Sequence, residues 1–129
     1  GPECYCGSRG CVETYISGGG LEKRFEEVFA QKKSGEKILK NFNANEKEKA
    51  FVMEFFNHYG RAMANLINIL DPDIVVLGGG LSNMEELYTL GTEKVQQYLF
   101  NDECRTPIVK NKLGDSAGVL GAALISDSI

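Results

Sequence analysis

The sequence lacks the features that mark several classes of protein. No run of about 18 apolar residues occurs, so no segment has the length that a bilayer-spanning helix needs. Positive charge is not in excess, because 14 Lys and Arg stand against 18 Asp and Glu and give a formal net charge of −4. A nucleic-acid surface needs clustered Lys and Arg. We therefore expect neither a membrane span nor a dedicated nucleic-acid surface.

The rest of the composition is typical of a folded globular protein. Hydrophobic residues make up 43% of the 129 residues and charged residues make up 25%, which are ordinary values for a globular domain. A chain of this length fits one domain. The composition argues against a disordered segment or a collagen-like repeat, and no internal repeat or low-complexity tract occurs.

Cysteine is rare but concentrated, because three of the four cysteines lie within the first 11 residues: Cys4, Cys6 and Cys11. Disulfide bonds are one interpretation, although a Cys-x-Cys pair closes poorly on itself and the third thiol would need the distant Cys104. Nothing else in the sequence indicates an oxidising compartment, so we expect a cytoplasmic protein. Cys104 is predicted to be a small packed side chain.

Zinc binding explains the clustered thiols better than disulfides do, with free or oxidised thiols as the alternative. Thiolates are soft ligands, and Gly7 and Gly10 allow the backbone to curl so that the sulfur atoms converge. A closed tetrahedral site needs a fourth ligand. The only histidine, His58, lies among aromatic residues and is better interpreted as an ordinary helix residue. We therefore expect the fourth ligand to precede Gly1.

Apolar spacing and turn residues predict an α/β chain with several helices and few strands. The expected helices span residues 13–17, 21–32, a short stretch near 38–42, 46–70, 82–100 and a final segment after 114–116. The expected strands are 73–77, predicted to be a buried parallel strand, and 107–113. Two strands make a poor sheet on their own, so we expect this sequence to be part of a larger fold.

Three local signals set the expected helix boundaries. The glycines at 18–20 are expected to stop the first helix. Asn43 and Glu46 have capping-box spacing before the long helix, and Ser82 and Glu85 have the same spacing after the first strand. The long helix carries more apolar positions than two strands can cover, so part of its surface is expected to contact another domain or a second subunit.

A glycine turn follows the first expected strand and consists of Gly78, Gly79 and Gly80. Ligands of open α/β sheets bind at the carboxyl ends of strands, and glycine lets a ligand approach the backbone without an intervening Cβ. The pattern is neither G-x-G-x-x-G nor a Walker loop, so the residues alone assign no pyrophosphate to it. A plain tight turn and a nucleotide contact are both open interpretations.

Three ordered motifs carry a family resemblance: Cys4-x-Cys6-Gly-x-x-Gly-Cys11-x-Glu13, then NILDPDIVVLGGGLSN at 68–83, then LGDSAGVLGAA at 113–123. Together they resemble the ROK (repressor, open reading frame, kinase) family. Within it, the stretches CYCG, ETYISG and ECRTP look most like bacterial fructokinases.

The resemblance implies the C-terminal half of an ATP-dependent hexose kinase, with fructose as the preferred hexose. The implied fold is part of an actin-like, ribonuclease-H-like ATPase lobe with an N-terminal zinc loop. Residues 1–20 would form the zinc loop and sugar-binding segment, 21–70 a helical segment, and 71–129 the nucleotide-side segment. Mg-ATP would bind in a cleft between two domains, and family kinases are commonly homodimers.

The resemblance also assigns roles to individual residues. It makes Cys4, Cys6 and Cys11 ligands of a structural zinc ion, together with a histidine preceding Gly1. It makes Glu13 an acceptor for sugar hydroxyls, although the residues alone favour Glu13 only as a helix-start acid stabilised by the helix dipole. It places Gly78, Gly79, Gly80, Leu81 and Asn83 at the adenosine of ATP.

The family's phosphate-binding Asp-x-Gly-Gly-Thr loop, its catalytic aspartate and its second phosphate loop would all precede the cysteines and do not occur here. Phosphoryl transfer depends on positioning and charge neutralisation, so we expect this chain alone to be inactive. One alternative is the sugar-sensing domain of a ROK transcriptional repressor, which would bring nucleic acid as a partner. A further alternative is a stand-alone zinc-stabilised interaction module.

Overall fold

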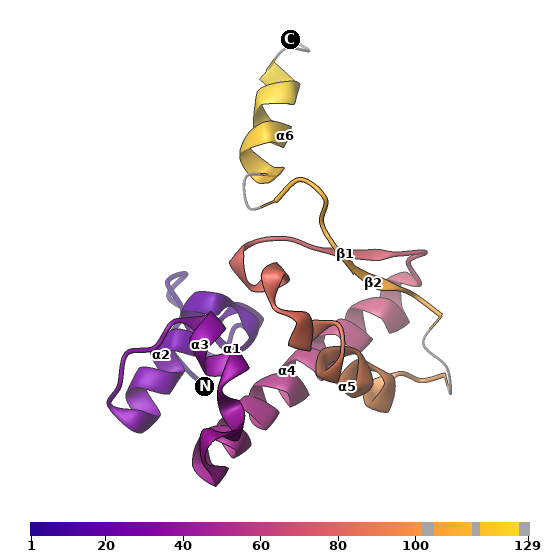
Figure 1. Ribbon diagram of the computed structural model, residues 1–129. Helices are drawn as coiled ribbons and strands as arrows, with labels where there is room; N and C mark the ends of the chain where they lie inside the picture. The colour runs from indigo at the N-terminus through magenta and orange to yellow at the C-terminus, as the bar shows by residue number, and fades with distance from the viewer. Residues whose placement is uncertain (102–104, 115–116, 127–129) are drawn as a thin grey trace.

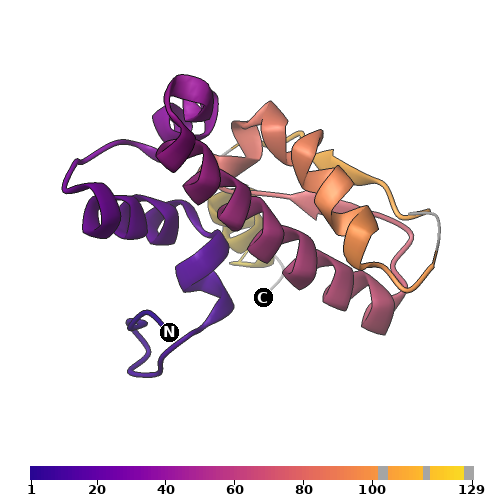
Figure 2. The same ribbon diagram turned by 90° about the horizontal axis from the view of Figure 1, so that it is seen from below.

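The computed structural model describes residues 1–101, 105–114 and 117–126. Its elements are α1 (Val12–Ile16), α2 (Gly18–Phe29), α3 (Gly35–Lys40), η1 (Phe42–Ala44), α4 (Glu46–Leu70), β1 (Val75–Leu77), η2 (Gly80–Asn83), η3 (Glu85–Leu87), α5 (Leu90–Tyr98), β2 (Ile108–Lys110) and α6 (Ala117–Ser126). In Figures 1 and 2, α1, α2 and α3 gather on one side of α4, and α5 runs along its other side. The final helix, α6, projects away from this body (Figure 1).

The long helix α4 forms the axis of the fold and confirms the helix predicted over 46–70. Its N-cap is Asn45, whose side chain accepts a hydrogen bond from the Glu48 amide at 2.9 Å. The capping-box prediction at Asn43 is therefore wrong by two residues, because Asn43 lies within the preceding turn η1. The helix ends at Leu70, and its C-cap residue Asp71 adopts a left-handed conformation with φ of 44°.

The hydrophobic core lies along one face of α4, where aromatic side chains fill the space toward α2, α3 and α5. Its buried members are Leu21, Phe25, Ile38, Leu39, Phe51, Val52, Phe55, Phe56, Tyr59, Met63, Ala64, Ile67, Met84, Leu87 and Val95. In the last turns of α4, Ile67 remains in this core, whereas Leu66, Ile69 and Leu70 are 51%, 78% and 68% exposed.

The two strands pair in parallel, as predicted, with Val76 opposite Val109. Both are shorter than expected, and the first is not buried on both faces. Val75 and Leu77 pack against the core, whereas Ile74 and Val76 are 51% and 57% exposed. The prediction of a fully buried strand is therefore wrong, since alternate residues of a strand point to opposite faces and only one face is covered here.

The first helix ends at Ile16, close to the predicted stop, but the glycines at 18–20 form the first turn of α2 and not a break between helices, which corrects a third prediction. Ser17 lies between α1 and α2, and its side chain accepts a hydrogen bond from the Gly20 amide at 3.0 Å, so Ser17 caps α2. A Cβ on Gly20 would lie 2.5 Å from the Thr14 carbonyl oxygen. Glycine is thus required at 20 because α1 and α2 approach so closely.

The helix expected over 82–100 is also wrong in its first half, where the chain forms the 3₁₀ turns η2 and η3 before α5 begins. The Ser82 hydroxyl donates to the Gly79 carbonyl at 2.7 Å and does not cap a helix. Tyr88 donates to the Ser82 carbonyl at 2.6 Å, and Asn111 donates to the Ser82 hydroxyl at 3.1 Å. These bonds hold the segment beside the end of β1. The final helix after 114–116 is confirmed as α6.

Candidate functional site

The N-terminal residues 2–11 form a compact turn that we call the cysteine loop. Glu3 and Arg9 pair as an isolated antiparallel bridge and also form an ion pair. Inside the bridge, the Cys4 amide donates to the Ser8 carbonyl at 2.9 Å. Gly7 adopts a left-handed conformation with φ of 85°, which glycine accommodates without strain. The sequence-predicted curl of this loop is therefore present.

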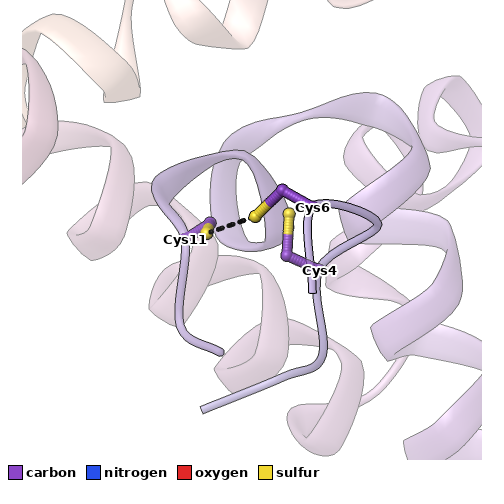
Figure 3. Close-up of side chains that lie close together, drawn as sticks. All are labelled: Cys4, Cys6 and Cys11. Carbon is purple, nitrogen blue, oxygen red and sulfur yellow. Dashed lines mark hydrogen bonds between the residues drawn. The ribbon is translucent and has the colours of Figure 1, made fainter. Parts of the chain in front are cut away.

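The three sulfur atoms of Cys4, Cys6 and Cys11 lie within 4.8 Å of one another. Figure 3 shows them pointing toward a common point, with Cys6 and Cys11 in contact at 3.6 Å. Sulfur ligands about 2.3 Å from a tetrahedral zinc ion are separated by roughly 3.8 Å, so the cluster fits three corners of such a site. All three cysteines are free thiols. Cys104 lies outside the described residues.

The cluster also favours the thiolate of Cys6 over that of Cys11. A hydrogen bond from the Ser8 backbone lowers the pKa of Cys6 to about 7. The contact with the Cys6 sulfur raises the pKa of Cys11 to about 11. His58 is not among the candidate metal ligands of the cluster. Its ring packs at a tilt against the ring of Tyr15.

Glu13 lies in the first turn of α1, directly after the cysteine loop, and is exposed. It borders a cavity of about 270 Å³ between the cysteine loop and α2. Tyr5 of the loop also lines this cavity, and the Glu13 carboxylate raises the pKa of Tyr5 by accepting a hydrogen bond from its hydroxyl. An exposed carboxylate in a concave site can accept hydrogen bonds from ligand hydroxyls.

The predicted nucleotide residues line a second, larger cleft of about 770 Å³. It is bordered by Gly78, Gly79, Gly80, Leu81 and Asn83 on one side and by the starts of α2 and α3 on the other. Gly79 has a left-handed φ of 79°. A Cβ on any of the three glycines would meet no described atom within 4 Å, so this wall presents bare backbone to the cleft.

The two cavities are neighbours, because Ser17 and Gly19 line both of them. The junction between α1 and α2 therefore forms a shared wall. A ligand bound near Glu13 and a ligand bound near Gly79 would lie on either side of it. The structure thus places the sequence-predicted sugar residue and the sequence-predicted nucleotide residues in two adjoining cavities that share this wall.

Sequence reasoning missed the far wall of the larger cleft, which includes Glu22, Gly35, Glu36 and Lys40. The Glu22 carboxylate accepts a hydrogen bond from the Gly35 amide at 2.7 Å and fixes the start of α3. Lys40 pairs with Glu36 at 2.6 Å and lowers the pKa of that carboxyl. No local sequence signal marks these residues, because the cleft forms only when α2, α3 and the glycine turn come together.

Comparison with known proteins decides the family. The profile of the ROK family matches residues 1–128. The chain belongs to the ROK family. It is 40% identical over 124 residues to an N-acetyl-D-glucosamine kinase of Vibrio atlanticus, covering 95% of this chain and 41% of that relative. It is 38% identical over 123 residues to an N-acetyl-D-glucosamine kinase of Yersinia enterocolitica, with the same shares covered.

Solved ROK structures confirm the fold. The ROK hexokinase from Thermus thermophilus superposes with a TM-score of 0.78 at 33% identity, covering 96% of this chain and 44% of that one. A ROK family transcriptional regulator, a homolog of the E. coli MLC protein, superposes with a TM-score of 0.72 at 21% identity, covering 98% of this chain and 35% of that one. This ROK chain therefore spans about two fifths of the length of the curated relatives it matches.

Within the described residues, no helix combines the length and the apolar character that crossing a bilayer requires.

Proposed function

We propose that this chain forms the C-terminal part of an ATP-dependent hexose kinase that transfers the γ-phosphate of ATP to a sugar hydroxyl. The observation that carries the proposal is the pair of cavities that meet at Ser17 and Gly19. Transfer between two bound ligands requires them to be held side by side in reacting distance. A sugar beside Glu13 and a nucleotide beside the glycine turn would occupy these two adjoining cavities.

On the sugar side, Glu13 is the proposed substrate-binding residue. Its carboxylate is exposed to the cavity and already accepts a hydrogen bond from Tyr5, which a sugar hydroxyl would replace or join. The binding of hydroxyls by a charged acceptor is stronger than by a neutral one. The exposed Tyr5 ring, in the same cavity wall, offers an apolar surface to the sugar ring.

On the nucleotide side, Gly78, Gly79, Gly80, Leu81 and Asn83 are the proposed adenosine-binding residues. Bare glycine backbone permits a flat ligand to lie against the chain. Leu81 packs close to Gly18 and Gly35 across the cleft, so it supplies an apolar surface between the two walls. Mg-ATP would bring the phosphates and the charge-neutralising ion, and the residues that act on them would come from the remainder of the parent protein.

The cysteine cluster is proposed to hold a structural zinc ion through Cys4, Cys6 and Cys11. Bound zinc would supply rigidity and not reaction chemistry, because a closed structural site leaves no position for substrate. The loop leads through Cys11 directly into α1, so a rigid loop restricts where Glu13 can lie. Reduced thiol ligands and ATP consumption both fit a cytoplasmic enzyme.

The choice of hexose and the oligomeric state are finer parts of the proposal. Fructose is the preferred hexose on the resemblance of the motifs, and N-acetyl-D-glucosamine is the alternative because the curated relatives named above act on it. A homodimer of the parent is proposed from the exposed apolar side chains of Leu66, Ile69 and Leu70 at the end of α4. The ROK regulator structure keeps a sugar-sensing repressor as the competing parent.

The test uses the full-length parent protein and its Glu13→Gln variant in a steady-state kinase assay with fructose, glucose and N-acetyl-D-glucosamine. Loss of the charged acceptor should raise the hexose KM by about tenfold or more, equivalent to the roughly 1.5–3 kcal/mol of a charged hydrogen bond. Glu26→Gln is the matched control, because Glu26 is an exposed carboxylate of α2 that pairs only loosely with Lys32 at 3.6 Å. A wild-type parent that phosphorylates none of the sugars would refute the proposal.

A further inference from the structure

A closed cycle of side-chain contacts joins α1, α2 and α4 beside the Glu13 cavity. The Tyr15 ring on α1 packs against the His58 ring on α4, with centroids 4.5 Å apart. His58 Nε2 lies 3.3 Å from Glu54 Oε1, and that oxygen accepts a hydrogen bond from Arg24 on α2 at 2.8 Å. The Arg24 guanidinium carbon lies 5.1 Å from the Tyr15 ring centre and so closes the cycle. We call these four residues the α1 anchor.

Arg24 is held far more firmly than a surface arginine. Only 13% of its side chain is exposed, because the guanidinium lies between the Tyr15 ring and the Phe51 ring, 5.6 Å from the latter. Phe51 is itself buried and packs edge-on against Phe25 in the core. Cation–aromatic contacts gain strength when water is excluded. The α1 anchor therefore connects α1 to the hydrophobic core.

The helix α1 needs such a connection. It has only five residues, and an isolated helix of that length is unstable in water. Its orientation must come from tertiary contacts, and Tyr15 supplies them on the side that faces α4. Two positions along an α-helix are about 200° apart, so Glu13 faces the opposite way, toward the cavity that it lines. Arg24 lines the same cavity from α2.

We propose that the α1 anchor positions Glu13 for the hexose, with Arg24 as the principal positioning residue. The inference rests on the proposed function, since it assigns Glu13 to the sugar. It adds that contacts on the far side of α1, in addition to the cysteine loop, fix the position of the Glu13 carboxylate. Loosening the anchor should weaken hexose binding without altering the nucleotide cleft.

The test compares Arg24→Met with Arg61→Met in the full-length parent. Arg61 lies on the same helix as Glu54 and makes a matched contact, 5.1 Å from the Tyr98 ring, on the side toward α5. Arg24→Met should raise the hexose KM by about tenfold, while kcat and the ATP KM stay within about twofold. Zinc content should not change. Arg61→Met should leave all four quantities unchanged.

A double-variant cycle asks whether Arg24 acts through Glu13. If it does, Arg24→Met combined with Glu13→Gln should raise the hexose KM no further than Glu13→Gln alone, because both changes remove one interaction. Additive effects would overturn the inference. Should Arg24→Met fail to fold, Tyr15→Leu breaks the same cycle of contacts and should raise the hexose KM in the same way. Tyr15→Phe keeps the aromatic ring and should have the wild-type KM.

The outcomes separate this inference from the proposed function. A parent that phosphorylates hexose, with Glu13→Gln impaired and Arg24→Met unimpaired, overturns the inference and leaves the function standing. A wild-type parent that phosphorylates no hexose refutes the function. Calorimetric titration with the same three sugars then decides the inference alone: weaker binding by Arg24→Met supports it, and unchanged or absent binding overturns it.

Discussion

Cys4, Cys6 and Cys11 are brought together by a loop of fewer than a dozen residues. Their proposed role in binding zinc can be tested by replacing one cysteine at a time. Replacing Cys6 with serine removes one proposed thiolate ligand from a cluster whose sulfur atoms lie within 4.8 Å of one another. Zinc affinity of the full-length protein should fall by more than the roughly 10–100-fold that loss of an outer-shell partner causes. Competition with a chromogenic chelator measures it.

Cys104→Ser is the control for that experiment, because it changes a cysteine that follows Cys11 by 93 residues in the sequence. Its zinc affinity should equal that of the wild type. Equal zinc affinity in Cys6→Ser and Cys104→Ser would contradict the assignment of the cluster as a metal site.

The Tyr59 hydroxyl is a second residue with a measurable consequence. Its ring is 4% exposed in the core, and the hydroxyl oxygen finds no hydrogen-bond partner among the described residues. A buried polar group without a partner costs stability. Tyr59→Phe should therefore raise the free energy of unfolding by about 1 kcal/mol, whereas Tyr88→Phe should lower it by a similar amount, since Tyr88 donates to the Ser82 carbonyl at 2.6 Å. Urea denaturation measures both.

The stability difference between Tyr59→Phe and the wild type should depend on pH. Burial raises the pKa of Tyr59 to about 12, above its ordinary value of about 10. The neutral phenol is therefore favoured in the folded state, and the stability linked to it is present below about pH 10 and declines toward about pH 12. The advantage of Tyr59→Phe over the wild type should therefore grow between about pH 10 and about pH 12. A constant difference would show that the phenol does not titrate with folding.

Among the helices and strands, the contact between α4 and α5 makes the sharpest prediction. A Cβ on Gly60 would lie 2.7 Å from the Lys94 carbonyl carbon, and that backbone atom cannot swing aside as a side chain would. Gly60→Ala should lower the free energy of unfolding by about 1–3 kcal/mol through overpacking. Gly19→Ala is the control, because a Cβ there meets no described atom within 4 Å. Equal effects in urea denaturation would contradict the close packing.

The elements also show what the sequence predicts and what it cannot. The helix α4 is predicted because its apolar residues repeat at helical spacing over 25 residues. The turns η2 and η3 are not, because Asn111 and Tyr88 bind Ser82 from 29 and 6 residues away. A local capping pattern at Ser82 cannot compete with contacts that exist only in the folded state.

The candidate site likewise has one part that the sequence predicts and one part that it cannot predict. The cysteines are predictable because their spacing within one loop almost dictates that the sulfurs meet. The shared wall at Ser17 is not, because it depends on the approach of the glycine turn, some 60 residues further along the chain, to the start of α2. The glycines at 18–20 are predicted as a break between helices, whereas the Ser17 side chain caps a helix that begins at Gly18.

At the scale of the whole molecule, we expect that the 129-residue chain alone does not catalyse phosphoryl transfer. In the proposed function it contributes one cavity for each ligand but, by the family resemblance, not the base or the phosphate loops on which phosphoryl transfer depends. Coupled ATPase and hexose phosphorylation assays on the purified 129-residue chain should stay at background. The full-length parent, assayed at equal concentration, is the control. Phosphorylation by the short chain would show that its own residues suffice.

The most direct measurement is the transfer of label from γ-labelled ATP to hexose by the full-length parent. We expect labelled hexose phosphate in equal amount to the ADP released, with transfer weakened in Glu13→Gln and retained in Glu26→Gln. Absence of labelled sugar from the wild-type reaction, or equal transfer by the two variants, would contradict the claim that adjoining cavities at Ser17 and Gly19 hold sugar and nucleotide side by side.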